Sequence, residues 1–242
     1  MEAFTHADGK IFHSLRLLVT RPGRLTADYL RGSRKPYIAP LQIFLISNLV
    51  FFLLHPLIGS NTLTTDLHTH LNYVWHQAAA RALVAPRLAA RNLTADDYAR
   101  VFDPAAVTLA KSLVILLVPI FSVAVMALYW RRRRHVSAHL VFALHFCSFW
   151  LLLICATLAV TNLAMGLLRY ADIFPSADMV TWCTFALTLT LSTLYLFRAV
   201  QVAFGSEAPG VAATKAGGLA LAFGLSLEAY RFVLFFITFW ST

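Results

Sequence analysis

The stretch LALAFGLSLEAYRFVLFFITFW, residues 219–240, decides the class of fold. An apolar helix of about 20 residues spans the ~30 Å hydrocarbon core of a bilayer, and this stretch is long enough to do so. Glu228 and Arg231 lie near its middle, where inserting a charged side chain costs roughly 2.5–3.5 kcal/mol. Their i, i+3 spacing places both on one helix face, so each can be the partner of the other. The stretch predicts a membrane protein that carries a polar site within the bilayer.

The composition of the whole chain supports this class. Of 242 residues, 59% are hydrophobic and only 13% are charged, against about 25% charged in soluble domains. The formal net charge is +9, and the basic residues flank apolar stretches. The positive-inside rule and anionic lipid headgroups explain that placement better than nucleic acid does, so no nucleic-acid partner is expected.

Apolar runs divide the chain into five expected membrane spans. We expect an all-α polytopic protein with a basic amphipathic segment over 1–38, a transmembrane domain over 39–242 and a helical outer loop over 58–105. Because residues 1–38 are polar and basic, we expect no cleavable signal peptide. Pro119 predicts a kink in the second span. The spans are expected at residues 39–57, 106–130, 138–168, 179–204 and 219–240.

Lys and Arg set the expected orientation. With a cytoplasmic N-terminus, the inner segments hold 13 of the 20 basic residues, the outer segments hold 6, and Arg231 lies within a span. The run of arginines at 131–134 lies in a short loop, where the positive-inside rule is strongest. We therefore expect a multi-pass protein of the bacterial inner membrane with an extracytoplasmic C-terminus.

Helical patterns fill the outer loop. One apolar stripe at helical spacing comprises Leu67, Leu71, Val74, Trp75 and Ala78. A second helix is expected to begin at Thr94, because Asp97 three residues later nearly forms a capping box, and to end at Asp103-Pro104.

The N-terminal stretch LLVTRPGRLTADYLRGSRKPYIAPLQIFLISNL, residues 17–49, carries a family resemblance. Its Arg21-Pro22-Gly23-Arg24, Asp28-Tyr29-Leu30 and Arg31-Gly32-Ser33-Arg34-Lys35 resemble a family of uncharacterised bacterial inner-membrane proteins, domain of unknown function 3667. The stretch RRRRHVSAHLVFALHFCSFW, residues 131–150, resembles the entry to that family's third span. The resemblance implies a multi-span bacterial membrane protein, in the form without the N-terminal zinc ribbon, and implies little about activity.

Basic residues gather in two expected cytoplasmic segments. Arginine suits bidentate phosphate contacts, and Gly and Pro punctuate the first segment, which favours a shaped pocket for an anionic headgroup or phosphorylated ligand. The alternative is that these charges only set topology and attract anionic lipid. The candidate binding residues are Arg21, Arg24, Arg31, Arg34, Lys35, Arg131, Arg132, Arg133, Arg134 and His139.

Several expected spans also carry a polar face. The candidate intramembrane polar site comprises Glu228, Arg231, Asn48, His55, His145 and Tyr195, since ionisable groups in a membrane usually serve function. An ion pair that only stabilises the fold is the alternative for Glu228 and Arg231. The stripe Thr181, Thr184, Thr188, Ser192 and Tyr195 is explained by helix packing, in which small hydroxyl residues let helices approach.

Metal sites have little support in the sequence. His139 and His145 are about 120° apart around a helix, so they do not bind one ion jointly without distortion. A metal site there would need help from His55, Glu228 or Cys147. In the outer cluster of Asp66, His68, His70 and His76, the side chains of His68 and His70 diverge by about 200° on a helix, which does not favour a metal site. Cys147, Cys155 and Cys183 lie within apolar segments and are not a disulfide framework. No cofactor is predicted.

Three functions from different classes remain open at this stage. The first is a small transporter, channel or lipid-handling protein with a cytoplasmic headgroup site and an intramembrane polar site. The second is a non-catalytic accessory or scaffold subunit of a membrane complex. The third is a membrane-embedded enzyme that acts on a lipid with His and Glu as metal ligands. No nucleotide-binding or hydrolase motif occurs. The expected partners are anionic phospholipids and either a second copy of the chain or another membrane subunit.

Overall fold

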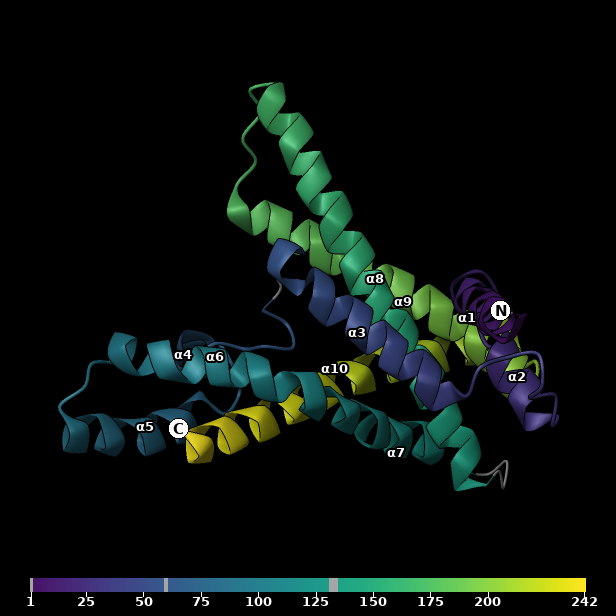
Figure 1. The fold of residues 1–242 in the computed structure, drawn as a ribbon, viewed down its shortest axis with the longest axis horizontal. Helices are drawn as coiled ribbons and strands as arrows, with labels where there is room; N and C mark the ends of the chain where they lie inside the picture. The colour runs from purple at the N-terminus through teal and green to yellow at the C-terminus, as the bar shows by residue number, and fades with distance from the viewer. Residues whose placement is uncertain (1, 59–60, 131–134) are drawn as a thin grey trace. The chain divides into compact units, whose positions relative to one another are not determined.

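The computed structural model describes residues 2–58, 61–130 and 135–242, and all elements within these ranges are helical (Figure 1). Arg131 to Arg134 and the side chain of His55 lie outside the described residues. The helices are α1 (Glu2–Thr20), α2 (Arg24–Leu30), α3 (Pro40–Ile58), α4 (Leu67–Asn72), α5 (Gln77–Arg91), α6 (Ala95–Leu113), the 3-10 turn η1 (Val114–Leu116), α7 (Leu117–Tyr129), α8 (Val136–Tyr170), α9 (Ala177–Phe204) and α10 (Pro209–Ser241).

Four helical stretches in the described part of the chain are long and apolar enough to cross a membrane. They are Ala95–Tyr129, Val136–Tyr170, Ala177–Phe204 and Pro209–Ser241, and the shorter Pro40–Leu54 is also apolar. The protein is therefore a multi-pass membrane protein with an all-α fold. The 3-10 turn η1 interrupts the regular helix shortly before Pro119, which itself lies in the first turn of α7.

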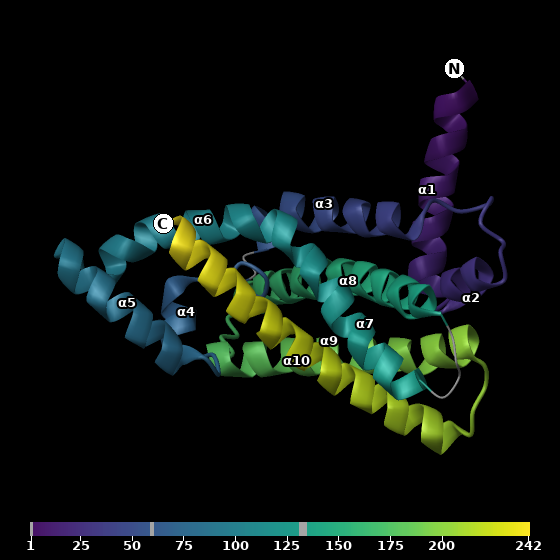
Figure 2. The same cartoon turned by 90° about the horizontal axis from the view of Figure 1, so that it is seen from below.

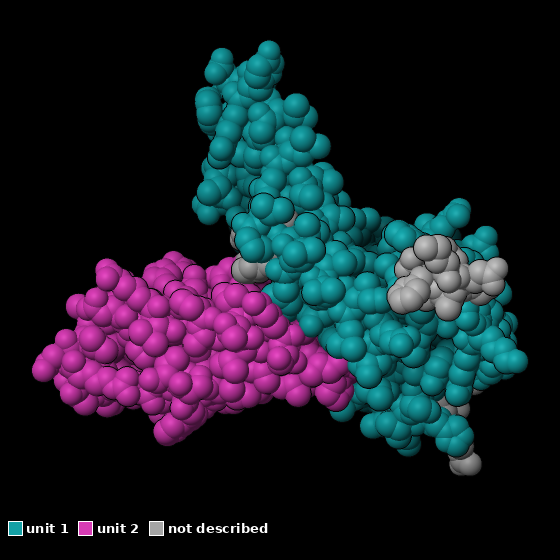
Figure 3. All heavy atoms as spheres, in the orientation of Figure 1, with its two compact units in different colours: residues 1–58, 121–223 teal, residues 59–120, 224–242 magenta. Residues whose placement is uncertain are grey.

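The chain divides into two compact units (Figure 3). Unit 1 comprises Met1–Ile58 and Phe121–Phe223, and unit 2 comprises Gly59–Ile120 and Gly224–Thr242. Each unit has its own packing, and the two are described separately.

In unit 1, α3 runs alongside α8 (Figure 2). Ile43, Phe44 and Phe51 are buried on α3, whereas its leucines at 41, 45, 49 and 53 are exposed. An apolar helix with one buried face and one exposed apolar face is typical of a span that contacts both protein and lipid.

The threonine stripe of α9 packs against α8, as the helix-packing interpretation predicts. The Thr184 hydroxyl lies 3.0 Å from the Thr161 hydroxyl, and Thr188 donates to Thr157 Oγ1 at 3.3 Å. Hydroxyl groups four residues apart on each helix thus form hydrogen bonds between α8 and α9. Each such bond stabilises helix packing by at most about 1–2 kcal/mol.

In unit 2, the C-terminal part of α10 is surrounded by α4, α5 and α6. Phe235 and Phe239 are buried against Val84, Tyr98 and Phe102. The Arg87 guanidinium donates to Tyr98 Oη at 3.1 Å and to the carbonyl of Phe239. A cation is favourable at a helix C-terminus, because the last carbonyls have no partner within the helix.

Two sequence expectations for the outer loop need correction, and one is confirmed. The capping box forms: Thr94 Oγ1 accepts from the Asp97 N–H and the Asp97 carboxylate accepts from the Thr94 N–H. The helix does not end at Asp103-Pro104, because α6 continues to Leu113. Proline suits helical φ and removes a single hydrogen bond, a loss that the burial of Phe102 and Ala106 on either side outweighs.

The prediction that the apolar stripe from Leu67 to Ala78 forms one continuous helix is also wrong. The chain turns between α4 and α5, over residues 73–76. Val74 and His76 are buried by this turn, whereas Trp75 is 65% exposed. The turn brings His76 back against His70, a contact that a straight helix does not allow.

Candidate functional site

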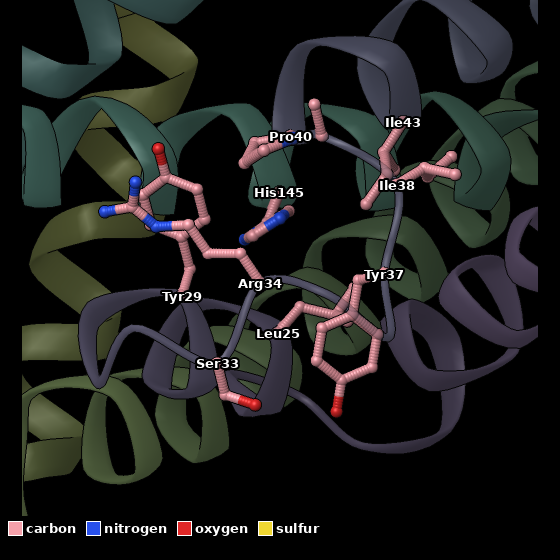
Figure 4. A pocket seen from close by; sticks show the side chains of 10 residues that line it. Leu25, Tyr29, Ser33, Arg34, Tyr37, Ile38, Pro40, Ile43 and His145 are labelled. Carbon is pink, nitrogen blue, oxygen red and sulfur yellow. The ribbon is translucent and has the colours of Figure 1, made fainter.

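The polar N-terminal segment meets the first apolar helix at a pocket of about 280 Å³ (Figure 4). The lining comes from α2, the segment that follows it, the start of α3 and one side chain of α8. It comprises Leu25, Tyr29, Ser33, Arg34, Tyr37, Ile38, Ala39, Pro40, Ile43 and His145. Its position, at the point where the chain passes into the apolar run that begins at Pro40, suits a ligand that is part polar and part apolar.

Gly23 allows α2 to reach this position. It precedes α2 with φ +79°, a conformation that L side chains rarely adopt, and a Cβ there would lie 2.4 Å from the carbonyl oxygen of Ala199 on α9. The Pro-Gly pair of the sequence motif therefore permits a close approach between α2 and α9.

Asp28 on α2 organises the charges beside the pocket. Its carboxylate accepts from Arg24 Nε at 2.7 Å, from Arg31 at 2.5 Å and from the Tyr37 hydroxyl at 2.8 Å. Burial raises the pKa of Asp28, but the hydrogen bonds from Tyr37, Arg24 and Arg31 outweigh that effect and the pKa lies below its ordinary value. The carboxyl is therefore charged at neutral pH and neutralises two arginines of the predicted basic cluster.

Arg34 differs from Arg24 and Arg31. Its guanidinium lies over the Tyr29 ring at 4.2 Å from the centroid, and no carboxylate pairs with it within the described ranges of the chain. Arg34 thus brings an uncompensated positive charge to the pocket wall.

His145 reaches the pocket from α8 and is only 5% exposed. Its Nδ1 lies 2.8 Å from Thr26 Oγ1. This hydrogen bond holds the ring in place and leaves Nε2 for a ligand. A buried polar side chain that lines a pocket is a common feature of ligand sites.

The other predicted headgroup residues lie elsewhere. Arg21 and Lys35 are exposed and do not line the pocket. His139 is buried, and its ring stacks on Phe204 with centroids 5.7 Å apart. His139 is thus part of aromatic packing in unit 1, and the sequence does not reveal this because Phe204 is far away along the chain.

The predicted intramembrane polar set is distributed over both units. In unit 1, Asn48 is half-buried on α3, and Tyr195 is buried with its ring stacked on Phe149. In unit 2, Arg231 donates to Glu228 Oε1 at 2.6 Å and to the carbonyl of Thr62 at 3.3 Å. Glu228 and Arg231 therefore pair with each other and contact the outer loop.

A histidine pair that sequence reasoning missed lies near these two charges. His70 Nδ1 and His76 Nε2 are 3.1 Å apart, and both rings are buried. The spacing of six residues carries no signal, because the turn between α4 and α5 creates the contact. No group of three or more potential metal ligands occurs among the described residues.

The match to a known family falls on the residues that build the pocket. Residues 8–52 match the model of DUF3667, a protein family of unknown function. The DUF3667 match confirms the resemblance of the N-terminal stretch, and it includes Asp28, Arg34 and all the lining residues except His145. No curated protein and no solved structure matches the chain.

Proposed function

We propose that this protein binds the headgroup of an anionic lipid in the pocket formed by α2, α3 and α8, and handles that lipid within the bacterial inner membrane. The observation that carries the proposal is the contrast among the arginines. Asp28 neutralises Arg24 and Arg31, whereas Arg34 faces the pocket with no carboxylate partner among the described residues. A guanidinium that has no carboxylate partner and a planar donor fork suits a phosphate group.

The apolar part of the lining suits the rest of such a ligand. Leu25, Ile38, Pro40 and Ile43 complete the wall, and α3 begins at Pro40. A headgroup bound at Arg34 would therefore have apolar surface beside it, where its acyl chains begin. A soluble polar metabolite gains nothing from such a surface.

The proposal includes a topology of five spans with the N-terminus in the cytoplasm. α3 has 19 residues, or about 28 Å at 1.5 Å per residue, close to the ~30 Å hydrocarbon core. Five spans place the two ends of the chain on opposite sides. Protease protection of N- and C-terminal epitope tags in sealed inverted vesicles tests this: we expect only the N-terminal tag to be cleaved. Cleavage of both tags, or of neither, would contradict five spans.

The headgroup site is tested by exchanging two neighbouring basic residues in turn. Arg34→Gln and Lys35→Gln remove the same charge, but only Arg34 lines the pocket. Native mass spectrometry of protein extracted in mild detergent then reports the lipid that remains bound. We expect anionic lipid to be lost from Arg34→Gln and retained by Lys35→Gln. Equal loss from both variants would mean general attraction to the membrane surface, and no bound lipid in either variant or in the parent would sink the proposal.

A further inference from the structure

The pocket has a charge pattern that discriminates among anionic lipids. None of the described lining residues is acidic, and both oxygens of the nearby Asp28 carboxylate are occupied by Arg24, Arg31 and Tyr37. The ammonium of a zwitterionic headgroup would thus lie beside Arg34 without an anionic partner. Like charges repel each other at such a distance, so zwitterionic headgroups fit poorly.

Aromatic rings do not offer an alternative place for an ammonium group. Quaternary ammonium ligands are bound by the faces of aromatic rings. The Tyr29 ring is already covered by Arg34 at 4.2 Å, and the Tyr37 ring is stacked on His13 with centroids 5.8 Å apart. One face of each ring is therefore covered, that of Tyr29 by Arg34 and that of Tyr37 by His13. The positive charge of Arg34 also repels a choline group from the Tyr29 ring.

The lining offers hydrogen-bond donors from several elements. The Arg34 guanidinium and the Ser33 hydroxyl come from the segment after α2, the Tyr29 hydroxyl from α2, and the His145 ring from α8 (Figure 4). When Thr26 donates to Nδ1 of His145, Nε2 carries the proton and is a donor as well. Such a set suits a phosphate with three unesterified oxygens, since a phosphodiester offers only two.

The size of the pocket points the same way. At about 280 Å³ it is at the small end of ligand pockets, which are typically about 300–1,000 Å³. A terminal phosphate fits such a volume. A phosphate that also carries a second glycerol or a sugar forms a larger headgroup, which such a volume accommodates less well.

Building on the headgroup site of the proposed function, we propose that the pocket selects a terminal phosphate monoester on a membrane-anchored alcohol, in preference to phosphodiester and zwitterionic headgroups. Arg34 supplies the charge, and His145, held by Thr26, supplies the donor that reaches the third oxygen. His145 is in this sense the specificity-determining residue.

The test measures binding of three lipids with the same acyl chains to the full chain in one detergent. The lipids are phosphatidic acid, a monoester; phosphatidylglycerol, an anionic diester; and phosphatidylethanolamine, a zwitterion. We expect phosphatidic acid to bind at least about tenfold tighter than phosphatidylglycerol, a difference of about 1.4 kcal/mol, and phosphatidylethanolamine to bind weakest. Equal binding of the two anionic lipids would overturn the monoester proposal and leave the headgroup site intact. No binding of any lipid would overturn both.

Variants locate the selectivity. In His145→Gln, the ratio of the affinity for phosphatidic acid to that for phosphatidylglycerol should fall to near one. In Arg34→Gln, the binding of both anionic lipids should become weaker. Should His145→Gln not fold, Ser33→Ala is the second variant, because Ser33 lines the pocket and is exposed, with Ser137→Ala as its control on α8 outside the lining. An unchanged preference in a folded His145→Gln would overturn the role of His145. Where that variant does not fold, a preference that is the same in Ser33→Ala as in Ser137→Ala would overturn the assignment of the selectivity to this pocket.

Competition with inorganic phosphate separates a lipid from a soluble source of the same chemistry. If the ligand is a lipid, millimolar phosphate should displace phosphatidic acid only weakly, because it lacks the apolar part that Ile38, Pro40 and Ile43 contact. Displacement at equal concentrations would show that a soluble phosphate is the ligand and would overturn the membrane-anchored part of the proposal.

Discussion

Thr26 Oγ1 and His145 Nδ1 lie 2.8 Å apart and join α2 to α8 across 119 residues of sequence. Both residues are buried, with exposures of 1% and 5%. Thr26 lies in the N-terminal stretch that matches DUF3667, and His145 lies in the N-terminal half of α8. The hydrogen bond fixes the position of α2, and with it the pocket wall that carries Arg34.

Thr26→Val is expected to destabilise the protein by about 1–3 kcal/mol, because it keeps the shape of the side chain but leaves a buried ring nitrogen without its partner. Thermal unfolding in detergent measures the effect. Thr20→Val is the matched control, since Thr20 is exposed and bonds only within α1. Equal shifts in the two variants would show that the Thr26–His145 bond contributes nothing.

Gly23→Ala is expected to be more harmful than Gly32→Ala. Both glycines have positive φ, +79° and +86°, so either alanine bears the backbone strain of roughly 1–2 kcal/mol. Only at Gly23 does the new Cβ also collide with Ala199, whereas nothing lies within 4 Å of a Cβ at Gly32. The yield of folded protein and its thermal midpoint, measured for both variants, show whether Gly23→Ala is the more harmful change. Similar losses would mean that the close approach of α2 to α9 is not needed.

Unit 2 is expected to lose stability as the pH falls below about 6.5. Burial, together with the charges of His76 and Arg231, lowers the pKa of His70 to about 3. Burial lowers the pKa of His76 as well, although Glu228 opposes it. An unfolded histidine binds a proton near pH 6.5, so below that value the unfolded state holds more protons. The stability that His70 contributes is thus complete above pH 6.5 and falls toward pH 3 by up to about 1.4 kcal/mol per pH unit, and His76 acts in the same direction.

Thermal unfolding at several pH values between 7.5 and 4.5 measures this slope. In His70→Gln the slope should become shallower by about one proton, whereas His68→Gln, at an exposed neighbour on α4, should leave it unchanged. A parent slope that persists in His70→Gln would show that other groups cause the acid sensitivity.

The Glu228–Arg231 pair is expected to contribute a coupling free energy of about 1 kcal/mol. Its side chains are 32% and 22% exposed, and pairs with such exposure to water contribute about 0.2–1 kcal/mol. A double-mutant cycle with Glu228→Gln and Arg231→Gln measures the coupling. A value of about 3 kcal/mol or more, as for pairs broken in a dry interior, would show that the two charges lie fully within the bilayer.

Much of the architecture follows from local patterns. The apolar runs locate α8, α9 and α10 to within a few residues at most of their ends, except the start of α10, because burial in lipid or protein demands long apolar helices. The capping box at Thr94 and Asp97 is equally local, since the interacting atoms are three residues apart. The continuation of α6 through Pro104 could not be predicted in this way, because packing of Phe102 and Ala106 in unit 2 outweighs the local preference.

The candidate site divides in the same manner. Composition and spacing alone predicted a membrane protein, a basic N-terminal segment and the i, i+3 pairing of Glu228 with Arg231, because each depends on neighbours in sequence. Only the tertiary structure decided which arginine faces the pocket, that His145 meets Thr26 and that His70 meets His76. These depend on contacts between segments that the chain brings together by turning at Gly23 and at residues 73–76, and the free energy of such contacts comes from burial shared by both partners, which neither segment encodes by itself.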